Sequence, residues 1–244
     1  MKAMFAAALA AVLVPGVAHA EAGLGDKVYG ATVEGGVSEV EARYGRLVGD
    51  EADGEDAAVF EFSHGFSDRF YGAVLFEFER EPGEKRELEA IGFEGIAALG
   101  HVDAIDMDVA VYGEYEAVRG GADAVETKLL LQHKRGTFDG RLNLIAEKEL
   151  ESGEPLEFGY AASADWAAIG EFRLGAEAFG GLGTSRDFLS RSGHFAGPTV
   201  KTEIEGLPGH GELEIEAAYL FALGEARHEA DGQARLLLEY EFRF

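Results

Sequence analysis

The chain of 244 residues contains no cysteine, five prolines and a single tryptophan. Without cysteine it has no disulfide framework, no thiolate metal site and no thiol nucleophile. Beyond its N-terminal segment it lacks any apolar run of about 18 residues, which argues against a membrane-spanning helix. Basic residues are also scarce. The 21 Lys and Arg against 46 Asp and Glu give a net charge of −25, which argues against nucleic-acid binding through a basic face.

The N-terminal segment has the three parts of an export signal. Residues 1–2 (Met-Lys) are positively charged, residues 5–14 are apolar, and residues 18–20 (Ala-His-Ala) match the small-x-small pattern of a signal-peptidase site. The apolar run is too short for a transmembrane helix, which needs ~20 residues. The sequence therefore predicts a signal peptide over residues 1–20 and a mature chain over residues 21–244.

In the mature chain the apolar residues alternate with polar ones. Between Arg69 and Arg80, for example, Val74, Phe76 and Phe78 fall on one face, while Glu77 falls on the other. Such segments match the length of a tilted membrane strand, which needs ~9–11 residues. Twelve strands are expected, over residues 37–48, 56–65, 69–80, 86–98, 106–118, 124–135, 140–149, 155–166, 171–182, 195–205, 211–223 and 232–244.

Two short regions leave alternatives open. Residues 28–34 either extend the first strand or form a separate lead-in segment, and residues 21–36 could form a plug. In the fourth strand Ile91, Phe93 and Ile96 interrupt the alternation, which a β-bulge would explain.

The connections between the expected strands are alternately short and longer. Short connections include residues 65–68 and 136–139, and longer ones include residues 49–55 and 183–194. Membrane barrels have an even number of strands, short periplasmic turns and longer external loops. A soluble β-sandwich or lipocalin-like barrel would show the same alternation, but aromatic residues near the strand ends favour a membrane. The predicted fold class is therefore an all-β, antiparallel, up-and-down transmembrane β-barrel of about twelve strands.

The C-terminal pattern Leu236-x-Leu238-x-Tyr240-x-Phe242-x-Phe244 resembles the terminal strand of bacterial outer-membrane β-barrels of the porin and solute-transport type. The resemblance implies that Leu238, Tyr240, Phe242 and Phe244 form a membrane-insertion signature, which the barrel-assembly machinery reads. It also implies location in the cell outer membrane of a Gram-negative bacterium, in contact with lipid and lipopolysaccharide.

A second, shorter resemblance lies at residues 64–70 (His-Gly-Phe-Ser-Asp-Arg-Phe). It is similar to the Gly-Leu-Thr-Asp-Arg-Leu periplasmic turn of solute-transport barrels, including those linked to aromatic-compound degradation. Here Phe66 replaces Leu and Ser67 replaces Thr. Glycine and Asp suit a tight turn, so the resemblance concerns architecture and implies no binding residue.

If the apolar face meets lipid, the other face lines the lumen, where acids outnumber bases. Uncompensated charge is costly in a dry interior, so the pattern predicts either water and counter-cations in the lumen or protonated, paired carboxyl groups. The candidate pore-lining residues are Glu77, Glu114, Glu126, Glu216 and Glu239, with Arg43, Arg173 and Arg235 as organising counter-charges. The predicted function is passive passage of small solutes with a preference for cations.

Two alternatives remain open. One is a closed, non-conducting scaffold barrel. The other is an outer-membrane lipid-modifying enzyme, which the spacing does not favour: Ser63 and His64 are adjacent, so on a strand they point to opposite faces, and Ser192 and His194 fall in a predicted loop. The sequence therefore predicts no enzyme, no catalytic residue, no metal site, no cofactor and no nucleic-acid partner.

Overall fold

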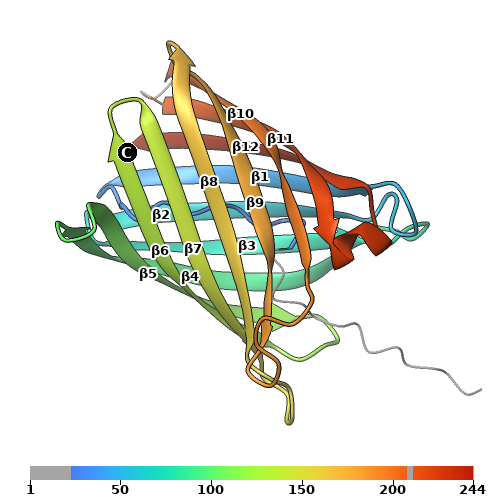
Figure 1. Cartoon of the computed structure of the whole chain (residues 1–244). Coiled ribbons are helices and arrows are strands. Elements are labelled where there is room, and N and C mark those ends of the chain that lie inside the picture. Colours follow the sequence, from blue (N-terminus) through green and yellow to red (C-terminus); the bar gives the residue numbers. More distant parts are fainter. Residues whose placement is uncertain (1–22, 208–210, 244) are drawn as a thin grey trace, which may run out of the picture.

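The computed structural model describes residues 23–207 and 211–243, which form a closed barrel of twelve antiparallel strands (Figure 1). Each strand pairs with its neighbours in sequence, and β1 pairs with β12 to close the barrel. The strands are β1 (Val37–Val48), β2 (Asp56–Ser67), β3 (Phe70–Arg80), β4 (Glu87–Val102), β5 (Met107–Val118), β6 (Ala124–Arg135), β7 (Phe138–Glu149), β8 (Glu157–Ile169), β9 (Phe172–Thr184), β10 (Gly193–Leu207), β11 (Gly211–Gly224) and β12 (Gly232–Arg243), with the 3-10 turn η1 (Glu225–His228) before β12. The predicted fold class is confirmed.

Side chains along each strand alternate between the interior and the outer surface. In β1, Glu41 and Arg43 are buried, whereas Val40 is 50% exposed on the outer face. In β3, Leu75 is buried and Phe76 is exposed. Successive side chains of a strand point to opposite faces, so the outer surface is mainly apolar and the interior carries most of the charge.

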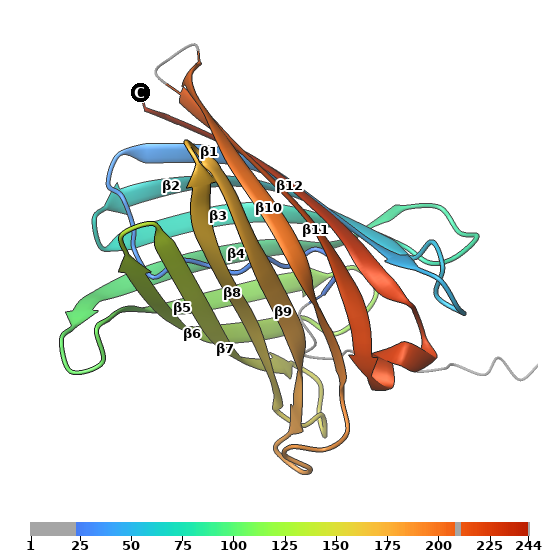
Figure 2. The same ribbon diagram turned by 45° about the horizontal axis from the view of Figure 1, so that its top comes forward.

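The two ends of the barrel differ in their connections (Figure 2). At one end the described turns span two to four residues, as between β2 and β3 and between β4 and β5. The turn between β10 and β11 includes residues 208–210, which lie outside the described residues. At the other end the loops are longer, as between β1 and β2 and between β11 and β12. Membrane barrels have short periplasmic turns, so we call the first end periplasmic and the second external. The predicted loop at residues 183–194 is shorter than expected, because β9 continues to Thr184 and β10 begins at Gly193.

Aromatic side chains gather near both ends of the outer surface. At the periplasmic end the rings of Phe138 and Trp166 lie 5.0 Å apart, and at the external end those of Tyr219 and Phe221 lie 5.2 Å apart. Such belts mark the two lipid–water interfaces of a membrane barrel. Among the described residues no helix is long and apolar enough to cross a membrane.

The interruption of the pattern in β4 has a different cause from the one expected. Bulges do occur, where β3 and β4 shift register near Phe78 and where β4 and β5 shift near Gly100. Between them the alternation is regular, and Ile96 simply faces inward, where it is 7% exposed and packs against Tyr29. An apolar residue can face the interior here because a further segment of the chain fills that part of the lumen.

That segment, residues 23–36, is here called the lumen segment. It precedes β1 and runs inside the barrel (the blue trace in Figures 1 and 2), so it is separate from the first strand. Its Val28, Tyr29 and Ala31 are buried. Residues 1–20, predicted to be a signal peptide, and Phe244 of the predicted insertion signature lie outside the described residues.

Candidate solute path in the barrel interior

The lumen segment crosses the interior from one end of the barrel to the other. At the periplasmic end the Gly36 amide donates to the Gly65 carbonyl at 2.7 Å. Nearer the external end Leu24 lies against β1. A Cβ atom added to Gly45 would lie 2.0 Å from the Leu24 carbonyl oxygen. A side chain at position 45 is therefore incompatible with this course of the segment.

Side-chain amides of β6 and β7 hold the backbone of the lumen segment. Asn143 Oδ1 accepts a hydrogen bond from the Tyr29 amide at 2.8 Å, and its Nδ2 donates to the Tyr29 carbonyl at 3.0 Å. Gln132 Oε1 accepts from the Ala31 amide at 2.9 Å. Buried backbone polar groups need partners, and here the barrel wall provides them in place of a neighbouring strand.

Apolar contacts fix the same side of the segment. Tyr29 and Ala31 pack with Ile96, Tyr112 and Leu130, which come from β4, β5 and β6. The rings of Tyr29 and Tyr112 lie 4.8 Å apart. We call the inner faces of β4–β7 the packed wall, because there the lumen segment and the barrel form a continuous core.

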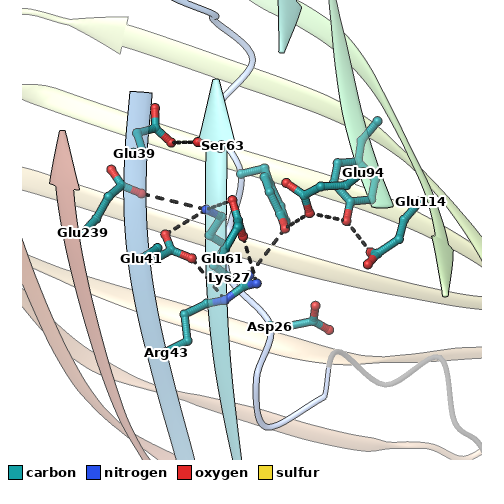
Figure 3. Close-up of polar contacts among 12 residues, drawn as sticks. Asp26, Lys27, Glu39, Glu41, Arg43, Glu61, Ser63, Glu94, Glu114 and Glu239 are labelled. Carbon is teal, nitrogen blue, oxygen red and sulfur yellow. Dashed lines mark hydrogen bonds and ion pairs between the residues drawn. The ribbon is translucent and has the colours of Figure 1, made fainter. Parts of the chain in front are cut away.

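Charged groups on the packed wall are tied into this core (Figure 3). The Tyr29 and Tyr112 hydroxyls both donate to Glu94 Oε2 at 2.8 Å, and Tyr112 also contacts Glu114. The Lys128 ammonium lies 2.9 Å from Glu126 and 4.8 Å from the centre of the Tyr29 ring. Glu114 and Glu126 are thus engaged in hydrogen bonds or ion pairs with the packed wall.

The opposite side of the segment faces charged groups of β1, β2 and β12. Lys27 Nζ lies 2.8 Å from Glu41, 3.5 Å from Glu61 and 3.8 Å from Glu239 (Figure 3). Arg43 pairs with Glu41 at 3.1 Å and with Glu61 at 3.0 Å. Lys27 therefore interacts with carboxylates that belong to three different strands.

Between the lumen segment and the inner faces of β10–β12 and β1, here called the open wall, lies a cavity of about 310 Å³. The open wall carries many carboxylates, and several oppose one another directly across strands: Glu214 faces both Glu203 and Glu239, and Glu239 faces Glu41. Like charges in that position repel. The carboxylates lining the cavity outnumber its bases, and they are Asp26, Glu34, Glu39, Glu41, Glu177, Glu203, Glu214, Glu216, Glu239 and Glu241.

The structure separates the predicted pore-lining residues into three groups. Glu216, Glu239, Arg43 and Arg235 line the cavity. Glu77, Glu114 and Glu126 also have inward positions, on β3, β5 and β6, but they do not line it. Arg173 pairs with Asp165 on β8 and donates to the Thr137 carbonyl at 3.1 Å, so it too lies apart from the cavity.

Other residues of the site went unnoticed in the sequence. The alternation gives no role to Lys27 or Tyr29, and it does not distinguish Asn143 and Gln132 from other inward residues. A signal was present, since Asn143 is the only asparagine in the chain and lies on an inward position where it is fully buried. A buried amide needs partners, and a backbone segment inside the barrel can supply them.

At the external rim, above the open wall, Glu55 lies in the loop between β1 and β2. Burial raises the pKa of the Glu55 carboxyl, and the nearby carboxylates of Glu229 and Glu81 raise it further. Glu55 thus lies near other carboxylates at the rim above the open wall.

A serine–histidine pair exists, and it joins His64 to Ser38 of β1 instead of to the adjacent Ser63. Ser38 Oγ lies 2.8 Å from His64 Nδ1, while Ser63 donates to Glu39 on the inner face. Ser38 is 0% exposed, so its hydroxyl is closed to a substrate, and His194 contacts Tyr160. Within residues 23–207 and 211–243, no group of three or more His, Asp or Glu side chains is arranged to hold a metal ion.

On the outer surface, the three described residues of the predicted insertion signature lie on β12. Leu238 is exposed, and the rings of Tyr240 and Phe242 stack with centroids 5.8 Å apart. β12 pairs with β1 at the seam that closes the barrel. The position of these residues matches what the resemblance implies for a terminal strand, while their role in insertion stays a prediction.

Comparison with known proteins supports the fold. No family model and no curated relative matches the chain. Among solved structures, the COG4313 outer membrane channel from Pseudomonas putida F1 is 12% identical with a TM-score of 0.58, and the match covers 90% of this chain and 98% of that one. The KdgM porin is 11% identical with a TM-score of 0.54, covering 84% and 99% of the two chains. KdgM is also known in complex with disordered oligogalacturonate.

At such low identities the likeness concerns the fold. The chain has the fold of bacterial outer-membrane porins and channels. Its closed strand pairing, apolar outer face and two aromatic belts are those of a barrel in the outer membrane.

Proposed function

We propose that the barrel gives small solutes passive passage across the outer membrane, with a preference for cations. The observation that carries this proposal is the cavity of about 310 Å³ along the open wall, lined by more carboxylates than bases. A water molecule occupies ~30 Å³ of liquid volume, so the cavity has room for several waters or a hydrated ion.

The charge of the open wall supports the preference for cations. Glu203, Glu214 and Glu239 face one another across β10, β11 and β12, and Lys27 is the nearest base to Glu239. A negative lining between low-dielectric walls raises the local concentration of cations. The lumen segment limits the path to small solutes, because it occupies the space beside the packed wall.

The same segment favours a second candidate function, a barrel that does not conduct. It is held by amide hydrogen bonds, aromatic contacts and ion pairs, all of which would have to be satisfied anew if it moved. A silent but correctly folded barrel would support this scaffold role.

The test is single-channel recording of the refolded mature chain in a planar bilayer under a KCl gradient. We expect discrete conductance steps with a cation-selective reversal potential. The variant E214Q/E239Q/E241Q should bring the reversal potential towards zero. The control E84Q/E151Q/E225Q removes the same charge from exposed loop residues and should leave selectivity nearly unchanged. Equal effects of the two variants would contradict a selective open wall.

We also propose the partners that the terminal strand implies. Leu238, Tyr240 and Phe242 present an apolar, aromatic surface beside the β1–β12 seam, suited to outer-membrane lipid, lipopolysaccharide and the barrel-assembly machinery. Replacing Tyr240 and Phe242 by Ser should slow assembly in the presence of that machinery more than spontaneous refolding in detergent.

A further inference from the structure

Arg235 is an unpaired cation on the open wall. It lies on the inner face of β12, between Ala218 of β11 and Gly45 of β1. Its guanidinium carbon lies 4.2 Å from the centre of the Phe179 ring, and its Nη1 atom is buried with no hydrogen-bond partner. Among the described residues no carboxylate lies within 4 Å of it, although Glu177, Asp26 and Glu216 are near enough to attract it.

The other bases around the cavity are already engaged. Lys201 lies 2.5 Å from Glu216 and 3.9 Å from Glu177, and Arg43 pairs with Glu41 and Glu61. Arg141 pairs with Asp139 at 3.0 Å. A guanidinium has five donors in a fixed fork that fits a carboxylate, so Arg235 keeps its capacity to bind one.

The Phe179 ring explains how Arg235 can stay unpaired. A guanidinium is weakly hydrated and is attracted to the face of an aromatic ring. This contact holds the side chain over β9 without using its hydrogen-bond donors. The arginine is thus positioned in advance for a ligand that enters the cavity.

The excess of carboxylates lies further along the same wall. Glu239 follows Arg235 by four residues on β12, which places the two Cα atoms about 13 Å apart along a strand. Glu239 faces Glu41 and Glu214 across the neighbouring strands, and Lys27 reaches it at 3.8 Å. The cavity therefore has an unpaired cation towards its external side and surplus negative charge towards its periplasmic side.

We propose that this cavity binds small, extended zwitterions such as short peptides, with the carboxylate on Arg235 and the ammonium group beside Glu239 and Glu214. The inference deepens the proposed function, on which it rests, by naming the class of solute. A simple cation would leave Arg235 unmatched, and a simple anion would be repelled by the carboxylates. A solute with a carboxylate at one end and an ammonium group at the other complements both Arg235 and the carboxylates of Glu239 and Glu214.

The experiment is calorimetric titration of the refolded chain in detergent micelles with three probes that share the triglycine backbone. Triglycine is zwitterionic, triglycinamide lacks the carboxylate, and N-acetyltriglycine lacks the ammonium group. We expect triglycine to bind at least about tenfold more tightly than either single-charge probe, since each charged hydrogen-bonded pair contributes about a factor of ten or more. Equal binding of triglycine and N-acetyltriglycine, or of triglycine and triglycinamide, would overturn the proposal.

Two variants locate the site. R235Q should weaken triglycine binding about tenfold or more, and R235K, which keeps the charge but loses the fork, should weaken it less. The control R135Q removes an exposed arginine at the end of β6 and should bind triglycine as the parent does. Heat-modifiable gel migration verifies that each variant is folded. If R235Q does not refold, R235K and the three-probe comparison still decide.

Binding and conduction can be scored separately. Cation-selective conductance without triglycine binding would overturn the zwitterion site and leave the proposed passage intact. Triglycine binding by a silent barrel would contradict the passage and retain the site. R235Q binding triglycine as tightly as the parent would remove Arg235 from the site.

Discussion

The packed wall and the open wall come from the same kind of strand, yet they behave differently. Both carry glutamates that oppose one another across strands, such as Glu114 and Glu126 on the packed wall and Glu214 and Glu239 on the open wall. On the packed wall Tyr112, the amides of Asn143 and Gln132, and Lys128 engage the lumen segment. On the open wall the carboxylates line a cavity.

This difference shows that charge alone does not decide whether a barrel interior is filled or open. Barrels of ~8 strands are filled by their own side chains, and those of ~16–18 leave a channel. At twelve strands the outcome depends on what else enters the lumen. Here a single segment, anchored by Asn143 and Gln132, covers the packed wall and leaves a cavity along the open wall. Its Val28 also belongs to an apolar cluster with Phe179 of β9 and Leu220 of β11.

The largest expected effect comes from displacing the lumen segment, which lies between the packed wall and the open wall. In Gly45→Val the new side chain would meet the Leu24 carbonyl oxygen, which a Cβ atom at this position already approaches to 2.0 Å. We expect the lumen segment to leave its place and single-channel conductance to rise several-fold. The control Gly113→Val adds the same side chain where a Cβ meets nothing within 4 Å. Unchanged conductance of a folded Gly45→Val barrel would show that the segment does not limit the path.

The sequence predicts the strands of the barrel better than it predicts the segment inside the barrel. The strands were predicted to within four residues of their observed ends, because alternation and turn residues are local features. The inward positions of Glu77 and Glu216 follow from the same alternation.

The sequence allows a plug over residues 21–36, but the course of the lumen segment could not be predicted in the same way. Residues 28–34 alternate like a strand, and their partners Gln132 and Asn143 lie more than a hundred residues later in the chain. Which glutamates face the cavity depends on where that segment lies. The alternation therefore placed Glu114 and Glu239 alike on inward faces, although only Glu239 lines the cavity.

The second-largest expected effect comes from removing the ion pairs that join the lumen segment to β1, β2 and β12. Lys27→Met removes a buried ammonium group from Glu41, Glu61 and Glu239. Breaking a buried ion pair by removing one partner costs about 3–5 kcal/mol. We expect a loss of that order in the free energy of unfolding by urea in lipid vesicles, together with stronger cation selectivity. Lys85→Met, in an exposed loop, is the control, and equal losses in both variants would remove Lys27 from the anchor.

Asn143→Leu tests the link to the packed wall. It removes two hydrogen bonds to Tyr29 and leaves the buried amide and carbonyl of that residue without partners. An unsatisfied buried group costs about 1–3 kcal/mol. Because two groups lose their partners, we expect a loss in the free energy of unfolding comparable to that of Lys27→Met. Thr202→Val, a change to an apolar side chain on the outer face of β10, should have little effect. A larger loss for Asn143→Leu than for Lys27→Met would make the packed wall the main anchor.

The smallest effect concerns the rim above the open wall and depends on pH. The pKa of Glu55 is raised above its ordinary value of 4.5 by burial and by the nearby carboxylates of Glu229 and Glu81. The folded loop therefore favours the protonated form, and ionised Glu55 destabilises it. This destabilisation is absent well below pH 4.5 and complete above the raised pKa. Glu55→Gln should thus slow hydrogen exchange in the β1–β2 loop at pH 7 and have little effect at pH 4. The control Glu154→Gln, in the exposed loop between β7 and β8, should not change hydrogen exchange at either pH. An equal response of the two loops would show that the rim above the open wall does not differ electrostatically from the rim above the packed wall.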